Sequence, residues 1–140
     1  MVKVDSDKAF ETMTAEEICA WALKEFGRDI ALASSFGAED VVLIDMLVKI
    51  DPKARIFTLD TGRLNQETYN VMDAIREKYM INFEVMFPDT AATEKMVREK
   101  GMNLFYESIE NRKLCCGVRK VEVHKRALSQ VDAWITGLRR

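Results

Sequence analysis

Short apolar segments alternate with amphipathic helical patterns along this chain of 140 residues. The segments that favour strands are residues 30–34, 54–59, 83–87 and 133–136. The helical patterns between them are residues 41–50, 66–79, 90–100 and 117–130. Strands separated by helices of this length are typical of βαβ units in a parallel sheet. We therefore predict one α/β domain over residues 1–140, built on a parallel sheet.

A further helix is predicted before the first strand. Thr14 and Glu17 form a capping box, and Gly27 ends the apolar pattern that follows. Between 103 and 114 the pattern is irregular, so only short helical turns are expected there.

Composition points to an ordinary globular protein. Hydrophobic residues are 48% and charged residues 31% of the chain. No apolar run reaches the roughly 18 residues that a membrane span needs. The first eight residues also lack the apolar core of a signal peptide. We expect a cytoplasmic protein without a membrane partner, whose three cysteines are free thiols or ligands rather than disulfides.

The net charge of −2 conceals an asymmetry between the two parts of the chain. Residues 1–94 carry a net charge of −8, and residues 95–140 carry +6. The chain as a whole is too acidic for a general nucleic-acid binder. Its basic part could form a local anion site, or only a solvated helix face.

Ligands of parallel α/β sheets bind at the carboxyl ends of the strands. Those ends are predicted at residues 34–40, 60–63, 88–90 and 137–140. In the first of them, two serines, Gly37 and a helix N-terminus could offer backbone amides to an anion. The alternative is a polar turn capped by Ser35. Neither a Walker A loop nor a dinucleotide glycine motif is present.

The second strand ends in a turn that presents Arg63. The planar guanidinium of Arg63 suits phosphate or sulfate. Asp60 could accept a hydrogen bond from a ribose hydroxyl, or only cap the turn. The last strand leads directly into Arg139 and Arg140, and we expect that the chain is a piece cut where a functional loop begins.

Cys115 and Cys116 are adjacent, just before the helix predicted from Gly117. Adjacent cysteines rarely bridge each other because the ring is strained. Their thiolates could bind a soft metal, but an iron–sulfur site requires four ligands. Cys19 is predicted as a core residue. His124 is expected to be solvated, so no closed zinc site is predicted within the chain.

Four segments, in this order, resemble the assimilatory adenylylsulfate and phosphoadenylylsulfate reductases. They are Ser34–Asp40, Leu59–Leu64 with Glu67 and Thr68, Cys115–Glu122 with Arg126–Leu128, and Trp134–Arg140. The resemblance covers roughly residues 15–140. It implies an adenine-nucleotide α-hydrolase-like fold, a Rossmann-like three-layer arrangement with helices on both faces of the sheet, which is truncated here.

The resemblance also implies a reaction. A cysteine thiolate attacks the sulfur of the sulfonucleotide, AMP or adenosine 3′,5′-bisphosphate leaves, and thioredoxin or glutaredoxin releases sulfite. That cysteine matches no position here, so no catalytic residue is predicted and this chain alone should not turn over. The implied substrate contacts are Ser34, Ser35, Phe36, Gly37, Leu59, Asp60, Thr61, Gly62, Arg63, Lys120, Gly137, Arg139 and Arg140.

By the same resemblance, Cys115 and Cys116 match two of the four ligands of a [4Fe–4S] cluster. Lys120 would lie between that cluster and the bound anion. Because the paired cysteines occur in members that use adenylylsulfate, we expect that substrate rather than its 3′-phosphorylated form. The family commonly has proline and an apolar residue at the positions of Val123 and His124, which is a departure here.

Three alternatives stay open. The first is a phosphoadenylylsulfate reductase. The second is an ATP pyrophosphatase of the related PP-loop group, whose Ser-Gly-Gly-x-Asp-Ser loop is altered here at Phe36, Glu39 and Asp40. The third is a non-catalytic nucleotide-binding fragment. An unfinished sheet edge favours association of such a fragment, and a homo-oligomer is among the expected partners.

Overall fold

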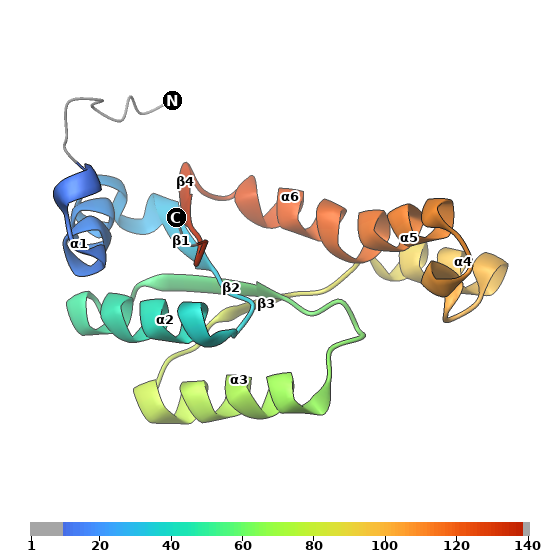
Figure 1. Ribbon diagram of the computed structural model, residues 1–140, viewed down its shortest axis with the longest axis horizontal. Coiled ribbons are helices and arrows are strands. Elements are labelled where there is room, and N and C mark those ends of the chain that lie inside the picture. The colour runs from blue at the N-terminus through green and yellow to red at the C-terminus, as the bar shows by residue number, and fades with distance from the viewer. Residues whose placement is uncertain (1–9, 139–140) are drawn as a thin grey trace.

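The computed structural model describes residues 10–138, and its centre is a sheet of four parallel strands in the order β3-β2-β1-β4 (Figure 1). The strands are β1 (Ile30–Ala33), β2 (Arg55–Leu59), β3 (Glu84–Met86) and β4 (Ala133–Ile135). The chain passes from β1 outward to β3, then returns to pair β4 with the other side of β1. This confirms the predicted parallel sheet and places the topological switch between β1 and β4.

The helices alternate with these strands. They are α1 (Ala15–Phe26), α2 (Ala38–Ile50), α3 (Gln66–Tyr79), α4 (Thr90–Lys100), α5 (Ile109–Cys116) and α6 (Glu122–Leu128). A π-helical turn, η4 (Gly117–Val121), joins α5 to α6, and the 3-10 turns are η1 (Phe10–Thr12), η2 (Gly27–Asp29) and η3 (Leu104–Tyr106). Between residues 10 and 138, no helix has the length and apolar character needed to cross a bilayer.

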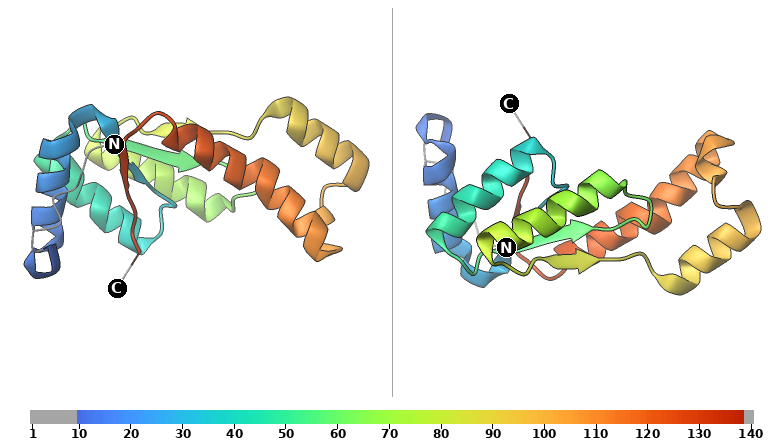
Figure 2. Two further views of the ribbon diagram at one scale, coloured as in Figure 1. Left: turned by 90° about the horizontal axis from the view of Figure 1, so that it is seen from above. Right: turned by 90° about the horizontal axis from the view of Figure 1, so that it is seen from below.

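Both faces of the sheet are covered, as predicted (Figure 2). Leu32 and Ile56 belong to a core cluster with residues of α1, α2 and α3. Ala31 and Phe57, one position earlier or later, pack with Ala127 of α6 on the opposite face. Successive side chains of a strand point to opposite faces, so this alternation sorts the core into two layers.

The capping signals account for the helix starts. The Thr14 and Glu17 capping box is present at α1, and the Asn65 side chain accepts from the Thr68 amide at α3. At α4, the Asp89 carboxylate accepts from the Ala92 amide at 2.9 Å. The predicted strand end at residues 88–90 is therefore used to start a helix.

The region after α4 differs from the prediction. Ser108 caps α5 by accepting from the Asn111 amide, and helical structure then continues from Ile109 to Leu128. Gly117 has ordinary helical angles, φ −58° and ψ −50°, and so does not begin a new helix. The prediction of short helical turns holds for η3, but it was wrong for residues 109–114, which belong to α5. The predicted helix start at 117 was also wrong, because the tertiary packing of this segment outweighs its weak local pattern.

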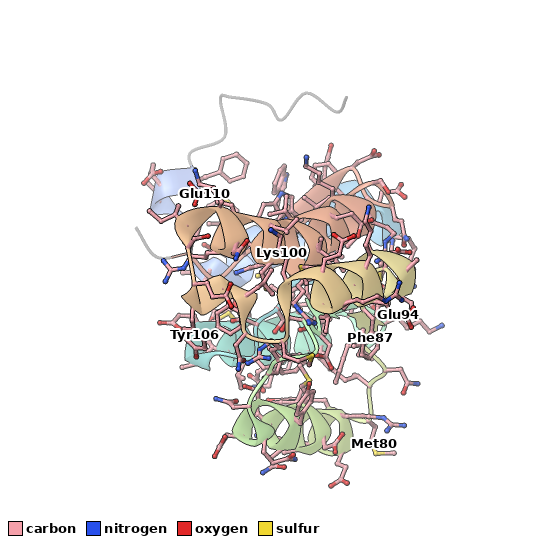
Figure 3. All side chains as sticks on the ribbon, turned by 90° about the vertical axis from the view of Figure 1, so that its right-hand side faces the viewer. Met80, Phe87, Glu94, Lys100, Tyr106 and Glu110 are labelled. Atoms are coloured by element: carbon pink, nitrogen blue, oxygen red, sulfur yellow. The ribbon has the colours of Figure 1, made fainter. Side chains whose placement is uncertain are left out.

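A small third cluster forms at this end of the molecule. Met96 of α4, Leu104 of η3 and Cys115 of α5 are buried together there. Figure 3 looks at this end, where Lys100 and Tyr106 lie on the surface. The α4–α5 end thus has its own packing, separate from the two layers of the sheet.

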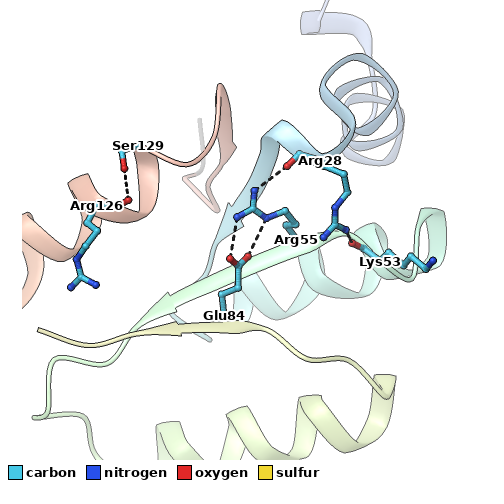
Figure 4. A network of polar contacts seen from close by, with 6 residues as sticks. All are labelled: Arg28, Lys53, Arg55, Glu84, Arg126 and Ser129. Carbon is cyan, nitrogen blue, oxygen red and sulfur yellow. Dashed lines mark hydrogen bonds and ion pairs between the residues drawn. The ribbon is translucent and has the colours of Figure 1, made fainter.

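Polar contacts hold the amino ends of the strands together (Figure 4). Arg55, at the start of β2, pairs in a two-point contact with Glu84, at the start of β3, with N–O distances of 3.0 and 3.1 Å. It also donates to the carbonyl of Arg28. The hydrogen bond from Arg55 to Glu84 raises the pKa of the guanidinium. These contacts link the amino ends of β2 and β3 to the turn before β1. The loops at the carboxyl ends of the strands are where parallel α/β sheets bind ligands.

Candidate functional site

The loop after β1 is held by its own side chains. The Asp40 carboxylate accepts from the Ser35 amide at 2.6 Å and from the Ser35 hydroxyl at 2.7 Å. The Phe36 amide donates to the Ser34 hydroxyl at 3.1 Å. The sequence left open whether this segment binds an anion or forms a polar turn, and the Ser35 and Phe36 amides bond within the loop. The amides of the first turn of α2, which have no intrahelical acceptors, are the ones suited to a ligand.

Phe36 has a structural role in this loop. Its backbone is in the left-handed region, with φ 59°. Its side chain is buried, and its ring lies 4.9 Å from that of Phe83. The side chain therefore anchors the loop to the core instead of lining the site.

The end of β4 meets the same loop at the topological switch. A Cβ atom at Gly137 would collide with the Asp40 carboxylate, so the close approach requires glycine. Arg139 and Arg140, predicted to bind phosphate and sulfate, lie outside the described residues.

The turn after β2 is organised around Asp60. The buried Asp60 carboxylate accepts from the Gly62 amide at 2.8 Å and from the Tyr69 hydroxyl at 3.0 Å. Burial, together with the neighbouring Asp60 carboxylate, raises the pKa of Tyr69. Of the two roles predicted for Asp60, the structure supports capping of the turn.

Arg119 fastens this turn to the η4 helical turn. It is 7% exposed and donates from Nη1 to the Thr61 carbonyl at 2.8 Å. Its Nε atom is buried and has no hydrogen-bond partner among residues 10–138. Arg119 was not among the predicted site residues. No local signal distinguished it, because its partner lies 58 residues away in the chain.

Gly62 is expected to tolerate substitution poorly. Its φ is +75°, and a Cβ atom would stand 3.2 Å from the Arg119 guanidinium. Gly62→Ala should lower the free energy of unfolding by about 1–2 kcal/mol, the cost of left-handed backbone for alanine. Urea unfolding measures this. The control is Gly117→Ala, which meets nothing within 4 Å and has helical angles; equal losses for both variants would contradict the account.

Arg63 does not face the other site residues. Its guanidinium donates to the Met102 carbonyl and to the Asn103 side chain, and it lies 4.8 Å over the Phe105 ring. These contacts tie the β2 turn to the segment that precedes α5. Its predicted contact with phosphate or sulfate stays a prediction.

A pocket of about 260 Å³ opens at the carboxyl ends of β1 and β2, under η4 and α6. Five predicted substrate contacts line it together: Ser34, Ser35, Leu59, Thr61 and Lys120. Five further residues, not predicted as contacts, complete the lining: Ala33, Phe57, Thr58, Leu64 and His124. The pocket thus combines an apolar floor, several hydroxyls and one lysine.

His124 was predicted to lie on a solvated helix face. The structure instead places it in the lining of this pocket. Its ring is 6.2 Å from that of Phe57 and 5.1 Å, edge to face, from that of Trp134. The signal that could have found it is its spacing of four residues from Lys120, since residues four apart share a helix face.

The cysteines do not form a metal site by themselves. Cys115 is buried in the α4–α5 cluster, whereas Cys116 is exposed. Cys19 is on the buried face of α1, in the core, where burial raises the pKa of its thiol. Within residues 10–138, no three potential ligands gather around one point. Among the described residues, Cys115 and Cys116 therefore supply at most two of the four thiolates that a [4Fe–4S] cluster requires.

The fold and the loops at the strand ends define an α/β protein of the adenine-nucleotide α-hydrolase-like class. Within that class, the chain belongs to the phosphoadenosine phosphosulfate reductase domain family, whose model matches residues 29–140. A crystal structure of phosphoadenylyl-sulfate reductase from Candida auris, a phosphate complex, shows the same fold. Its TM-score is 0.81 at 24% identity, and the match covers 94% of this chain and 64% of that one.

Two relatives illustrate the similarity in sequence. The chloroplastic 5′-adenylylsulfate reductase 1 of Arabidopsis thaliana is 47% identical over 133 residues, which is 95% of this chain and 28% of that protein. The adenosine 5′-phosphosulfate reductase of Pseudomonas aeruginosa strain LESB58 is 45% identical over 125 residues, 89% of this chain and 46% of its own length. The chain thus spans less than half the length of either relative.

Proposed function

We propose that this chain is the sulfonucleotide-binding part of an adenylylsulfate reductase of sulfate assimilation, an oxidoreductase that forms sulfite and AMP. The observation that carries the proposal is the pocket that joins Ser34, Ser35 and Lys120 at the strand ends. Similarity to proteins named adenylylsulfate reductases supports adenylylsulfate as the substrate.

In the proposed reaction, this chain binds and orients the nucleotide. The apolar floor of the pocket suits the base and ribose, and the Lys120 ammonium suits the negative charge. A cysteine thiolate from outside these residues attacks the sulfur, and the bond from sulfur to the bridging oxygen breaks. AMP leaves with that oxygen, and the cysteine carries the sulfonate. The dithiol of thioredoxin or glutaredoxin then becomes a disulfide as sulfite is released.

Three further parts of the proposal rest on the sequence resemblance. A [4Fe–4S] cluster would take Cys115 and Cys116 as two ligands, with two further thiolates from outside the chain and a reoriented Cys115. A homo-oligomer and a cytoplasmic location are also proposed. The alternative location is an organelle, because the relative from Arabidopsis thaliana is named chloroplastic.

The alternatives differ in the nucleotide they require. A phosphoadenylylsulfate reductase would need room and charge for a 3′-phosphate. An ATP pyrophosphatase is disfavoured, because the Asp40 carboxylate lies at the loop that would hold pyrophosphate and would repel its negative charge. A non-catalytic fragment would bind nucleotide without any reaction.

Calorimetric titration with adenylylsulfate, phosphoadenylylsulfate and ATP tests the proposal. We expect adenylylsulfate to bind most tightly, and Lys120→Ala to weaken it about tenfold, as for the loss of one charged contact. Lys125→Ala, an exposed lysine of α6 outside the pocket lining, makes the same change in net charge and should have little effect. Preferential binding of ATP, or equal losses in the two variants, would contradict the proposal.

A further inference from the structure

His124 presents its imidazole ring to the pocket. The ring is positioned by Phe57 and Trp134, which contact it from β2 and β4. Among the residues that the structure describes, none forms a hydrogen bond with either ring nitrogen of His124. The imidazole therefore lines the pocket with a free donor and a free acceptor when it is neutral.

His124 and Lys120 mark opposite ends of the pocket. Phe57 and Trp134 are the central residues of their strands, so His124 lies over the sheet itself. Lys120 follows Arg119, which bonds to Thr61 beyond the end of β2. His124 is half-buried and Lys120 is exposed, so we place His124 at the inner end of the pocket and Lys120 at its mouth.

This polarity fits one orientation of a nucleotide. The inner end is formed by Ala33, Phe57 and His124, which suit a flat aromatic base, and the cation stands at the mouth. A volume of about 260 Å³ is below the roughly 300–1,000 Å³ of pockets that enclose drug-sized ligands. The pocket therefore accommodates one part of a nucleotide, and its apolar lining selects the base.

We propose that His124 contacts the base of the bound nucleotide and donates or accepts a hydrogen bond at its polar edge. The proposal rests on the nucleotide-binding function and makes His124 a specificity-determining residue. When the polar edge of a base enters the inner end of the pocket, it loses its hydrogen bonds to water. A hydrogen bond to a ring nitrogen of His124 replaces one of them and so favours binding of a purine.

Adenosine and AMP distinguish the base from the phosphate. His124→Phe keeps a ring between Phe57 and Trp134 but removes the nitrogens. It should lower the affinity of the 140-residue chain for adenosine and for AMP by the same factor, about tenfold. Lys120→Ala should lower only the affinity for AMP. Titration by calorimetry, or by NMR where binding is weak, gives both ratios.

His124→Gln is a second variant, in which the glutamine amide supplies a donor and an acceptor without the ring. We expect the His124→Gln chain to bind adenosine more tightly than the His124→Phe chain. Thermal unfolding checks that each variant is folded. A loss in His124→Phe confined to AMP would assign His124 to the phosphate and overturn the proposal, as would unchanged affinity for both ligands. If the unaltered chain bound neither adenosine nor AMP, the proposed function would fail together with this proposal. If Lys120→Ala lowered the affinity for AMP but His124→Phe changed neither affinity, only the proposal for His124 would fail.

Discussion

Asp40→Ala should lower the free energy of unfolding by about 3 kcal/mol and weaken nucleotide binding at least tenfold. The carboxylate is 7% exposed and accepts two hydrogen bonds from Ser35. The substitution removes two hydrogen bonds to a charged group, and each such bond contributes about 1.5–3 kcal/mol. Because the same bonds shape the loop at the topological switch, we expect the loss of binding to accompany the loss of stability.

Two further variants separate the loss of the hydrogen bonds to Ser35 from the loss of the negative charge of Asp40. Asp40→Asn keeps one acceptor oxygen and should lie between the wild type and Asp40→Ala. Glu16→Ala removes an exposed acid from the first turn of α1, where only the helix dipole is affected, and should cost at most about 1 kcal/mol. Urea unfolding and AMP titration provide the readouts. If Asp40→Ala and Glu16→Ala changed the free energy of unfolding and the affinity for AMP equally, the Asp40 carboxylate would not determine the conformation of the loop.

Leu32→Ala should be the most destabilising of the core substitutions, at about 3 kcal/mol. Leu32 is 0% exposed in the central strand β1 and packs in the cluster formed with α1, α2 and α3. Removing a buried leucine loses its transfer free energy and leaves a cavity, which together cost about 2–5 kcal/mol. Chemical denaturation with a two-state fit measures this difference.

The matched control for this substitution is Leu114→Ala. Leu114 is 41% exposed on α5, and alanine is a good helix former. We expect a change below about 1 kcal/mol. Similar losses at the two positions would mean that the cluster around Leu32 is less well packed than the structure indicates.

Much of the architecture was predictable from local signals. The apolar strands and the caps at Thr14, Asn65 and Asp89 act within a few residues, and the helices at 66–79 and 90–100 have the predicted bounds. The general behaviour of βαβ units then required parallel strands with a site at their carboxyl ends. The prediction failed at residues 109–117, where the helical structure of α5 continues into η4, because α5 depends on packing against α4 and not on a strong pattern of its own.

Within the site, the sequence by itself determined which loops meet, because parallel strands bring their carboxyl ends to one edge. Only the tertiary structure decided which side chains face the pocket. Phe36 turns into the core, Arg63 bonds away from the pocket, and His124 turns into it. The physical reason is that each orientation depends on a partner distant in sequence, such as Phe83 for Phe36, and no local pattern encodes such a contact.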